Sequence, residues 1–148
     1  PEAFWPLHAG RLFELLETDL EVFDDAVGCA RELKTRGVPI AIATGSRRER
    51  LDATLRAAGL DGLFDATVAQ DEVEHSKPAP DLFLRAAELL GVEPEDCVAV
   101  EDSPTGVESA LAAGMRVVAV ARVPEHRESL RGGTVVDVLT TAVLEAGA

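Results

Sequence analysis

Three times along the chain, a helical pattern ends in glycine and an apolar run rich in β-branched residues follows. The glycines are Gly37, Gly91 and Gly114, and the runs occupy residues 38–43, 97–100 and 117–120. Glycine tolerates the left-handed backbone conformation in which many helices end. Because the runs are apolar on both alternating faces, we expect each strand to be covered by helices on both sides. This alternation predicts right-handed crossovers and a doubly wound α/β fold with a parallel sheet.

Weaker patterns extend this organisation toward both ends of the chain. Strands are predicted at residues 66–69 and 134–136, and a short helix at residues 137–145. Residues 1–22 differ, because their apolar residues form a stripe typical of a helix that belongs to a preceding unit; the stripe consists of Trp5, Leu12, Leu15 and Leu16. The chain of 148 residues, 47% of them hydrophobic, has the size of one domain with one core.

The charge balance limits the classes of partner. With 27 acidic and 14 basic residues the formal charge is −13, which opposes binding to nucleic acid or to an anionic membrane surface. No apolar run approaches the roughly 18 residues of a membrane span, and no signal peptide is recognisable, so we expect a soluble, cytoplasmic protein. Cys29 and Cys97 match no metal or redox spacing and are expected to be buried, reduced thiols. An anionic substrate would need a local positive trap, for which Lys77, the pair Arg47 and Arg48, and a bound cation are candidates.

Polar residues gather where the predicted strands end, which is the edge where open parallel sheets bind ligands. They are Thr44, Gly45, Ser46 and Arg47 after the first run, Lys77 in a loop before a helix, and Glu101 and Asp102 after the run at residues 97–100. A hydroxyl and a free backbone amide can hold a phosphate, a lysine can neutralise its charge, and paired carboxylates suit Mg²⁺. Taken singly, each has a structural alternative: a helix cap, a solvated lysine, an acidic loop. Together they predict a phosphoryl-transfer site.

The segment around Lys77 carries two prolines. Pro78 and Pro80 stiffen the chain and predict a helix that starts near Pro80, which would fix the direction of the lysine. We assign Asp81 to stabilisation of the N-terminus of this helix. His75 has no obvious partner in the sequence and is interpreted as an exposed loop residue.

In order and spacing, four stretches resemble the later motifs of the haloacid dehalogenase superfamily, in its phosphoglycolate phosphatase-like and β-phosphoglucomutase-like branch. They are IAIATGS at 40–46, SKPAPD at 76–81, VEDSPTGVESA at 100–110 and AAGM at 112–115. The resemblance implies a Mg²⁺-dependent hydrolase that acts on a small phosphorylated metabolite through an aspartyl-phosphate. In that scheme Thr44 and the Gly45 amide bind the phosphoryl group and Lys77 neutralises its charge. Ser46 and Arg47 contact substrate, and Asp102 with Glu101 holds Mg²⁺.

The first motif of that superfamily, an Asp-x-Asp-Gly-Thr-like strand end that supplies the nucleophile, is absent from the 148 residues. The nearest string contains Asp24 and Asp25, which are adjacent and lie in a helical pattern. The chain starts at Pro1 and its only methionine is Met115, so we expect an N-terminal truncation. Residues 1–22 would then be the remnant of a helical cap and residues 23–148 a core without its central first strand. Such a chain is expected to be inactive alone, and its unpaired strand edges should favour instability or self-association.

Several alternatives remain open at this point. A phosphomutase of the same superfamily differs mainly in the cap, and a phosphate-binding pseudoenzyme could have lost the nucleophile. A receiver-type signalling domain uses similar residues, but its acidic residues come first in the chain. A dehalogenase is disfavoured because Glu101 and Asp102 favour a metal-using site.

Overall fold

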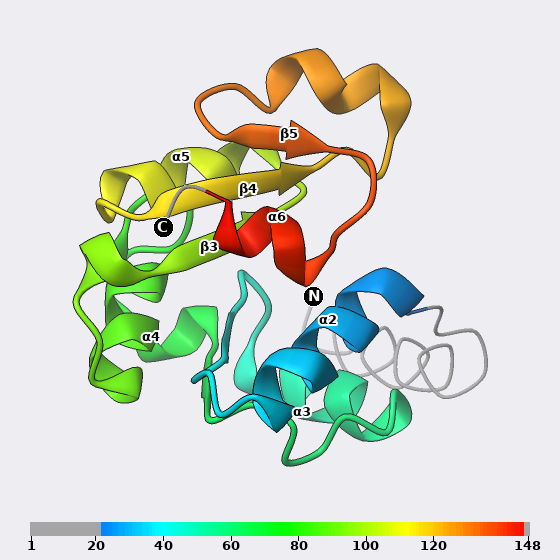
Figure 1. Ribbon diagram of the computed structural model, residues 1–148. Helices are drawn as coiled ribbons and strands as arrows, with labels where there is room; N and C mark the ends of the chain where they lie inside the picture. Colours follow the sequence, from blue (N-terminus) through cyan, green and yellow to red (C-terminus); the bar gives the residue numbers. More distant parts are fainter. Residues whose placement is uncertain (1–21, 147–148) are drawn as a thin grey trace, which may run out of the picture.

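The computed structural model describes residues 22–146, which form parallel strands joined by helices (Figure 1). The strands are β1 (Ala41–Ala43), β2 (Ala66–Val68), β3 (Val98–Glu101), β4 (Arg116–Val120) and β5 (Thr134–Val136). The helices are α2 (Asp24–Thr35), α3 (Arg48–Ala57), α4 (Asp81–Leu90), α5 (Pro104–Ala112) and α6 (Thr141–Glu145), with short 3-10 turns at η1 (Gln70–Glu72), η2 (Pro94–Asp96) and η3 (Pro124–Ser129). The apolar stripe predicted at Trp5, Leu12, Leu15 and Leu16 lies outside the described residues. No helix within residues 22–146 is long and apolar enough to cross a bilayer.

Each predicted strand is present, and the glycines that precede three of them have the expected backbone. Gly37, Gly91 and Gly114 have φ angles of 73°, 68° and 81°. These left-handed conformations end the preceding helices and turn the chain toward the sheet, because glycine has no Cβ to oppose them. The helix start near Pro80 is also confirmed, since α4 begins at Asp81.

All strand pairs are parallel, as predicted, but the described strands form two sheets. β1 pairs with β2, and β4 lies between β3 and β5 in a separate sheet of three strands. β1 and β3 therefore each have one edge without a strand partner among the described residues. The two edges flank the place where the superfamily resemblance puts a central strand.

Strand β4 shows why the fold is doubly wound. Val117 and Ala119 point into a core formed with α4 and α5, whereas Val118 and Val120 point into a second core formed with α2 and α6. Since successive side chains of a strand alternate between faces, the apolar run on both faces requires these two helical layers. Figure 1 shows α5 on one side of β4 and α6 on the other.

Helix α4 joins the two sheets on one face. Its Phe83 and Ala87 pack in the core of the three-stranded sheet, and its Leu82 and Ala86 pack in a core beneath β1 and β2. Leu82 is fully buried. The loop that carries Lys77 leads directly into this helix, so its position relative to both sheets is set by packing.

Candidate functional site

The carboxyl ends of β1 and β3 open onto one cavity of about 590 Å³. Its polar lining includes Thr44 and Gly45 after β1, Ser76 and Lys77 before α4, and Glu101, Asp102, Ser103 and Thr105 after Val100. Apolar parts of the wall come from Phe23, Ala26, Ile42, Ala43, Val100 and Val120, and Arg122 adds a second cation. Residues predicted from three separate motifs are thus brought to one place.

Thr44 is held so that its hydroxyl can donate toward a ligand. Its backbone N–H donates to the Val68 carbonyl at 2.9 Å, and its Oγ1 accepts from the Ser46 N–H at 3.1 Å. Because Oγ1 accepts this bond, its own hydrogen remains available for an anion. Thr44 does not cap α3, whose N-cap is Arg47, so the helix-cap alternative does not apply.

Ser46 and Arg47, which the resemblance also placed near substrate, do not line the cavity among the described residues. The backbone carbonyl of Ser46 accepts from the Gln70 N–H at 3.0 Å, and Arg47 is exposed. The predicted positive trap at Arg47 and Arg48 is therefore not part of this cavity.

Arg48 anchors the loop that follows β1 instead. Its guanidinium donates to the carbonyl and the hydroxyl oxygen of Thr67, both at 2.8 Å, and pairs with Glu72 at 2.5 Å and Asp52 at 3.1 Å. The hydrogen bond to Glu72 raises the pKa of Arg48, so its charge is secure. These contacts of Arg48, the Arg48 clamp, connect the start of α3 to β2 and so fix where residues 44–46 lie.

Lys77 and Glu101 form a nearly buried ion pair in the wall of the cavity. The Lys77 ammonium contacts Glu101 Oε1 and lies 4.9 Å from the centroid of the Phe83 ring. The side chains are 16% and 7% exposed, so solvent screens the pair weakly. Ser103 Oγ donates to Glu101 Oε2 at 3.1 Å and accepts from the Gly106 N–H at 3.1 Å. The solvated-lysine alternative is thereby excluded.

Asp102 is the carboxylate of the acidic pair that remains available to bind a cation. It is exposed and lines the cavity, and its side chain has no hydrogen bond or ion pair among the described residues. Residues 22–146 contain no cluster of three or more metal-binding side chains, so Asp102 and Glu101 would form a partial site. Such a set fits Mg²⁺, which commonly uses one or two protein carboxylates and keeps several waters.

Arg122 is a cavity residue that the sequence reasoning missed. It follows β4, and its guanidinium donates to Asp25 Oδ2 at 2.8 Å and stacks 4.2 Å from the centroid of the Phe23 ring. Asp25 also accepts from the Leu139 N–H at 2.8 Å, which links α2 to the segment before α6. The available sequence signal for Arg122 was a basic residue shortly after the apolar run that ends at Val120.

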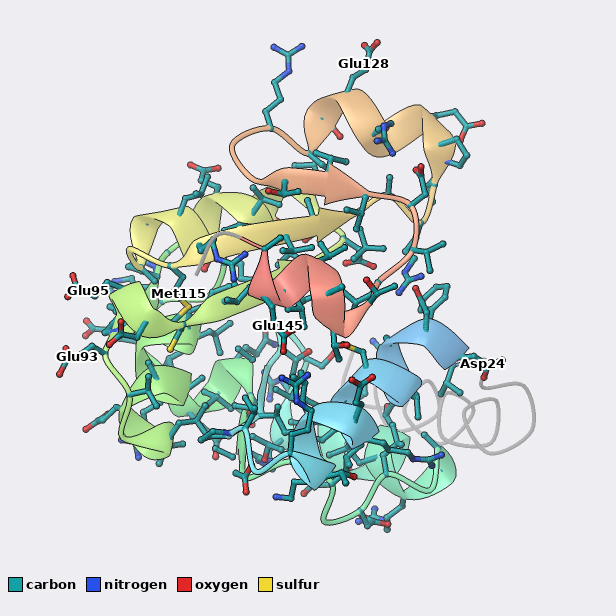
Figure 2. All side chains as sticks on the ribbon, viewed as in Figure 1. Asp24, Glu93, Glu95, Met115, Glu128 and Glu145 are labelled. Carbon is teal, nitrogen blue, oxygen red and sulfur yellow. The ribbon has the colours of Figure 1, made fainter. Side chains whose placement is uncertain are left out.

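The same contacts show why Asp25 is a poor candidate for a nucleophile. Chiefly through the hydrogen bond from Arg122, its pKa is lowered to about 2 despite partial burial, and its oxygens are occupied. Asp24 lies exposed at the start of α2, where Figure 2 shows it pointing away from the strands. The first motif requires two aspartates separated by one residue, and neither Asp24 nor Asp25 has such a partner in the sequence.

We expect the Asp25 cluster to make stability sensitive to acid. The pKa of Asp25 is about 2 in the folded protein, below its ordinary value of 3.8. Its ionised carboxylate therefore stabilises the fold fully at pH values above 3.8, and this contribution is lost as the pH falls from 3.8 through 2. At pH 7, Asp25→Asn should cost about 1 to 2 kcal/mol of unfolding free energy, and at pH 2 much less. Urea unfolding at both pH values measures the difference. Asp24→Asn, in the same helical turn, is the control, and an equal cost of Asp25→Asn at both pH values would contradict the assignment.

The structure also bears on predictions for His75, Asp81 and the two cysteines. His75 is exposed, as predicted, but it has a partner, because its Nδ1 lies 3.2 Å from Asp81 Oδ2. Asp81 accepts from the His75 backbone N–H at 3.0 Å, so its carboxylate closes the loop around Lys77 as well as standing at the start of α4. Both cysteines are free thiols; Cys29 is buried, but Cys97 is only half-buried. The Cys97 Sγ–H donates to the backbone carbonyl of Glu93 at 3.4 Å.

Comparison with known proteins gives a consistent picture. A family model of haloacid dehalogenase-like hydrolases matches residues 2–114. Fructose-1-phosphate phosphatase YqaB of Escherichia coli K12 is 49% identical over 82 residues, which are 55% of this chain and 44% of the relative. Protein CbbY of Rhodobacter capsulatus is 46% identical over 88 residues, or 57% and 39%. The crystal structure of a haloacid dehalogenase family hydrolase from Deinococcus radiodurans with bound phosphate and sodium has a TM-score of 0.80 and 34% identity, over 99% of this chain and 66% of that one. The chain spans less than half the length of both curated relatives.

Proposed function

The chain belongs to the haloacid dehalogenase-like hydrolases, and from this premise we propose that it carries the phosphate-binding and metal-binding part of a Mg²⁺-dependent phosphatase. The substrate is a small phosphorylated metabolite. The observation that carries the proposal is the single cavity shared by Thr44, Lys77 and Asp102, which come from three motifs. The relative named a fructose-1-phosphate phosphatase and the hydrolase solved with bound phosphate support the same class of chemistry.

The described residues supply binding and electrostatic stabilisation. The Thr44 hydroxyl and the Gly45 N–H can donate to oxygens of a phosphoryl group that enters the cavity. Lys77, held in the same wall, places a positive charge where the transferring group gains negative charge. Asp102, with Glu101 beside it, would hold Mg²⁺, which when bound offsets phosphate charge and orients the transferring group. The local cations matter because the chain as a whole carries a formal charge of −13.

The nucleophile is the missing part of this scheme. No Asp-x-Asp string occurs in the 148 residues. The adjacent aspartates Asp24 and Asp25 are the most similar string, but Asp25 is paired with Arg122 and Asp24 is exposed at the start of α2. We place the attacking carboxylate on a strand outside this sequence that lies between β1 and β3. That strand would complete one continuous parallel sheet and end beside Lys77 and Asp102, where the other polar ends gather.

Two other outcomes have distinct signatures. A phosphomutase would convert a sugar phosphate into its isomer without net release of inorganic phosphate. A pseudoenzyme would bind phosphate but show no turnover even with the strand present. Analysis of products by phosphorus NMR separates both from a phosphatase.

Replacing Asp102 by asparagine tests the metal part of the proposal. In a protein that combines these 148 residues with an Asp-x-Asp strand, Asp102→Asn should raise the Mg²⁺ concentration needed for half-maximal rate by about tenfold or more, because a hard anionic ligand is lost. Mg²⁺ titration of phosphate release measures the change. Glu108→Gln is the matched control, since Glu108 is exposed on α5 and does not line the cavity. An unchanged Mg²⁺ requirement for Asp102→Asn would argue against the assigned ligand.

A further inference from the structure

The structure gives the two carboxylates of the acidic pair different surroundings. Glu101 is 8% exposed and is engaged on both oxygens, one with the Lys77 ammonium and one with the Ser103 hydroxyl. Asp102, one residue later, is exposed and its side chain is unengaged among the described residues. Successive side chains along a strand point to opposite faces, so at the end of β3 the Glu101 side chain is buried and the Asp102 side chain is exposed. We therefore do not expect the two carboxylates to have equivalent roles.

Gly106 explains how Glu101 reaches its position. It lies in the first turns of α5 and is buried, and its N–H donates to Ser103 Oγ at 3.1 Å. A Cβ placed on Gly106 would overlap with both carboxylate oxygens and Cδ of Glu101, far inside van der Waals contact. The Glu101 carboxylate therefore occupies the space that a side chain at residue 106 would need.

The backbone at Gly106 gives no other reason for a glycine. Its φ is not in the left-handed region, unlike those of Gly37, Gly91 and Gly114. Within a helix, alanine is ordinarily more favourable than glycine. The atoms that collide with the added Cβ belong to the end of a flexible side chain, not to backbone. When alanine replaces Gly106, we therefore expect the carboxylate to move while the fold persists.

We propose that Glu101 is a positioning residue for Lys77, and that Gly106 provides the room that lets it act, which leaves Asp102 as the carboxylate that faces a cation. This rests on the proposed function, because it assigns the orientation of the lysine in that same cavity. Ser103 completes the arrangement, since its hydroxyl holds the second Glu101 oxygen and receives the Gly106 N–H. Glu101 therefore acts through the lysine, and a change at residue 106 reaches the cavity through Glu101.

The chain offers an internal reference for the test, because it contains only two lysines, Lys34 and Lys77. Lys34 pairs with Asp65 at 2.5 Å on the surface, with both side chains 38% exposed. With nitrogen-15 lysine labelling, NMR measures how fast the ammonium protons of each lysine exchange with water. The experiment uses the 148-residue chain in a chelating buffer without substrate, so its result does not depend on turnover or on Mg²⁺. A failure of this inference is thus distinguishable from a failure of the proposed function.

Gly106→Ala should raise the exchange rate of the Lys77 ammonium protons by about tenfold or more, because a charge-assisted hydrogen bond in a shielded site is lost. The Lys34 signal and the urea unfolding midpoint should stay near those of the parent chain. Glu101→Gln, which keeps the size and removes the charge, should produce the same change at Lys77. Combining Gly106→Ala with Glu101→Asp should slow the exchange again, because the shorter side chain removes the overlap and retains the carboxylate.

Gly28→Ala is the matched control, since Gly28 also lies within a helix but a Cβ there would meet nothing within 4 Å. It should leave both lysine signals unchanged. The inference is overturned if Gly106→Ala or Glu101→Gln leaves the Lys77 exchange rate unaltered. It is also overturned if Gly106→Ala unfolds the chain, because the overlap with the added Cβ would then displace the backbone and not the Glu101 carboxylate.

Discussion

Alanine in place of Lys77 should lower the turnover number for phosphate release by about 100-fold or more, once these residues are combined with a strand that carries the proposed nucleophile. The Lys77 ammonium is fixed by Glu101 and by the Phe83 ring, and its side chain is only 16% exposed. A cation that is already oriented and shielded from water stabilises developing charge without reorganisation, which is where electrostatic catalysis gains most. Steady-state kinetics with a generic phosphomonoester measures the effect.

Lys34→Ala provides the control for this prediction. Lys34 is the only other lysine, and it lies in a surface pair whose contribution to stability is expected to be about 1 kcal/mol or less. Its replacement should leave the turnover number within about twofold, since neither Lys34 nor Asp65 lines the cavity. A Lys77→Ala protein that keeps nearly the full turnover number and an unchanged KM would refute the idea that the three strand ends converge on one catalytic cavity.

Adding a peptide that carries the proposed central strand should order the sheet and produce activity together. Among the described residues β1 and β3 each have one edge without a strand partner, and Ile42 of β1 and Val100 of β3 line the same cavity. Val100 is 41% exposed although it lies within a strand whose other side chains are more buried. A parallel strand with apolar side chains would pair with both edges and cover these groups, and its binding energy would appear as stability of the complex.

Amide hydrogen exchange during titration of the peptide tests this directly. We expect protection of residues 41–43 and 98–101 to increase by about 100-fold at a peptide concentration 100 times the Kd, in parallel with the rate of phosphate release. The amides of residues 117–120 supply the control, because β4 already pairs with β3 and β5. Their protection should change much less. The 148-residue chain without the peptide should show no turnover above background, since no Asp-x-Asp string that could supply the nucleophile for covalent phosphoryl transfer occurs in it.

Two results would contradict the strand prediction. One is strong protection of both β1 and β3 in the chain alone that the peptide does not change, which would favour a self-sufficient pseudoenzyme. The other is turnover by the chain alone that is abolished by Asp24→Asn or Asp25→Asn, which would move the nucleophile to α2. Concentration-dependent association of the chain alone, reversed by the peptide, would show that the free edges also mediate contact between copies.

Local patterns in the sequence were sufficient to locate most of the fold. Apolar runs on both faces marked β1, β3 and β4, and helices ended where glycine could adopt a positive φ at residues 37, 91 and 114. These features depend on a few neighbouring residues, since backbone conformation and alternation of side chains are local properties. Thr44, Lys77 and Asp102, which line one cavity, were predicted as site residues for the same reason, because each follows or precedes a marked element.

Contacts between distant residues decided which polar side chains face the cavity. Asp25 and Arg122 are 97 positions apart, and nothing in the local sequence of either predicts their pairing. Ser46 and Arg47 follow Thr44 and Gly45 closely in the sequence but do not line the cavity, and the contacts of Gln70 and Arg48 set the path of that loop.

By itself, the sequence determined the kind of fold, the order of its elements and the chemical groups at the strand ends. Only the tertiary structure decided that Glu101 pairs with Lys77 while the Asp102 side chain has no partner among residues 22–146, and that Gly106 leaves room for this arrangement. The physical reason is that these outcomes depend on how α4 and α5 pack beside β3. Such packing places side chains to within a fraction of an ångström, and it results from the whole set of long-range contacts and not from any short stretch of the chain.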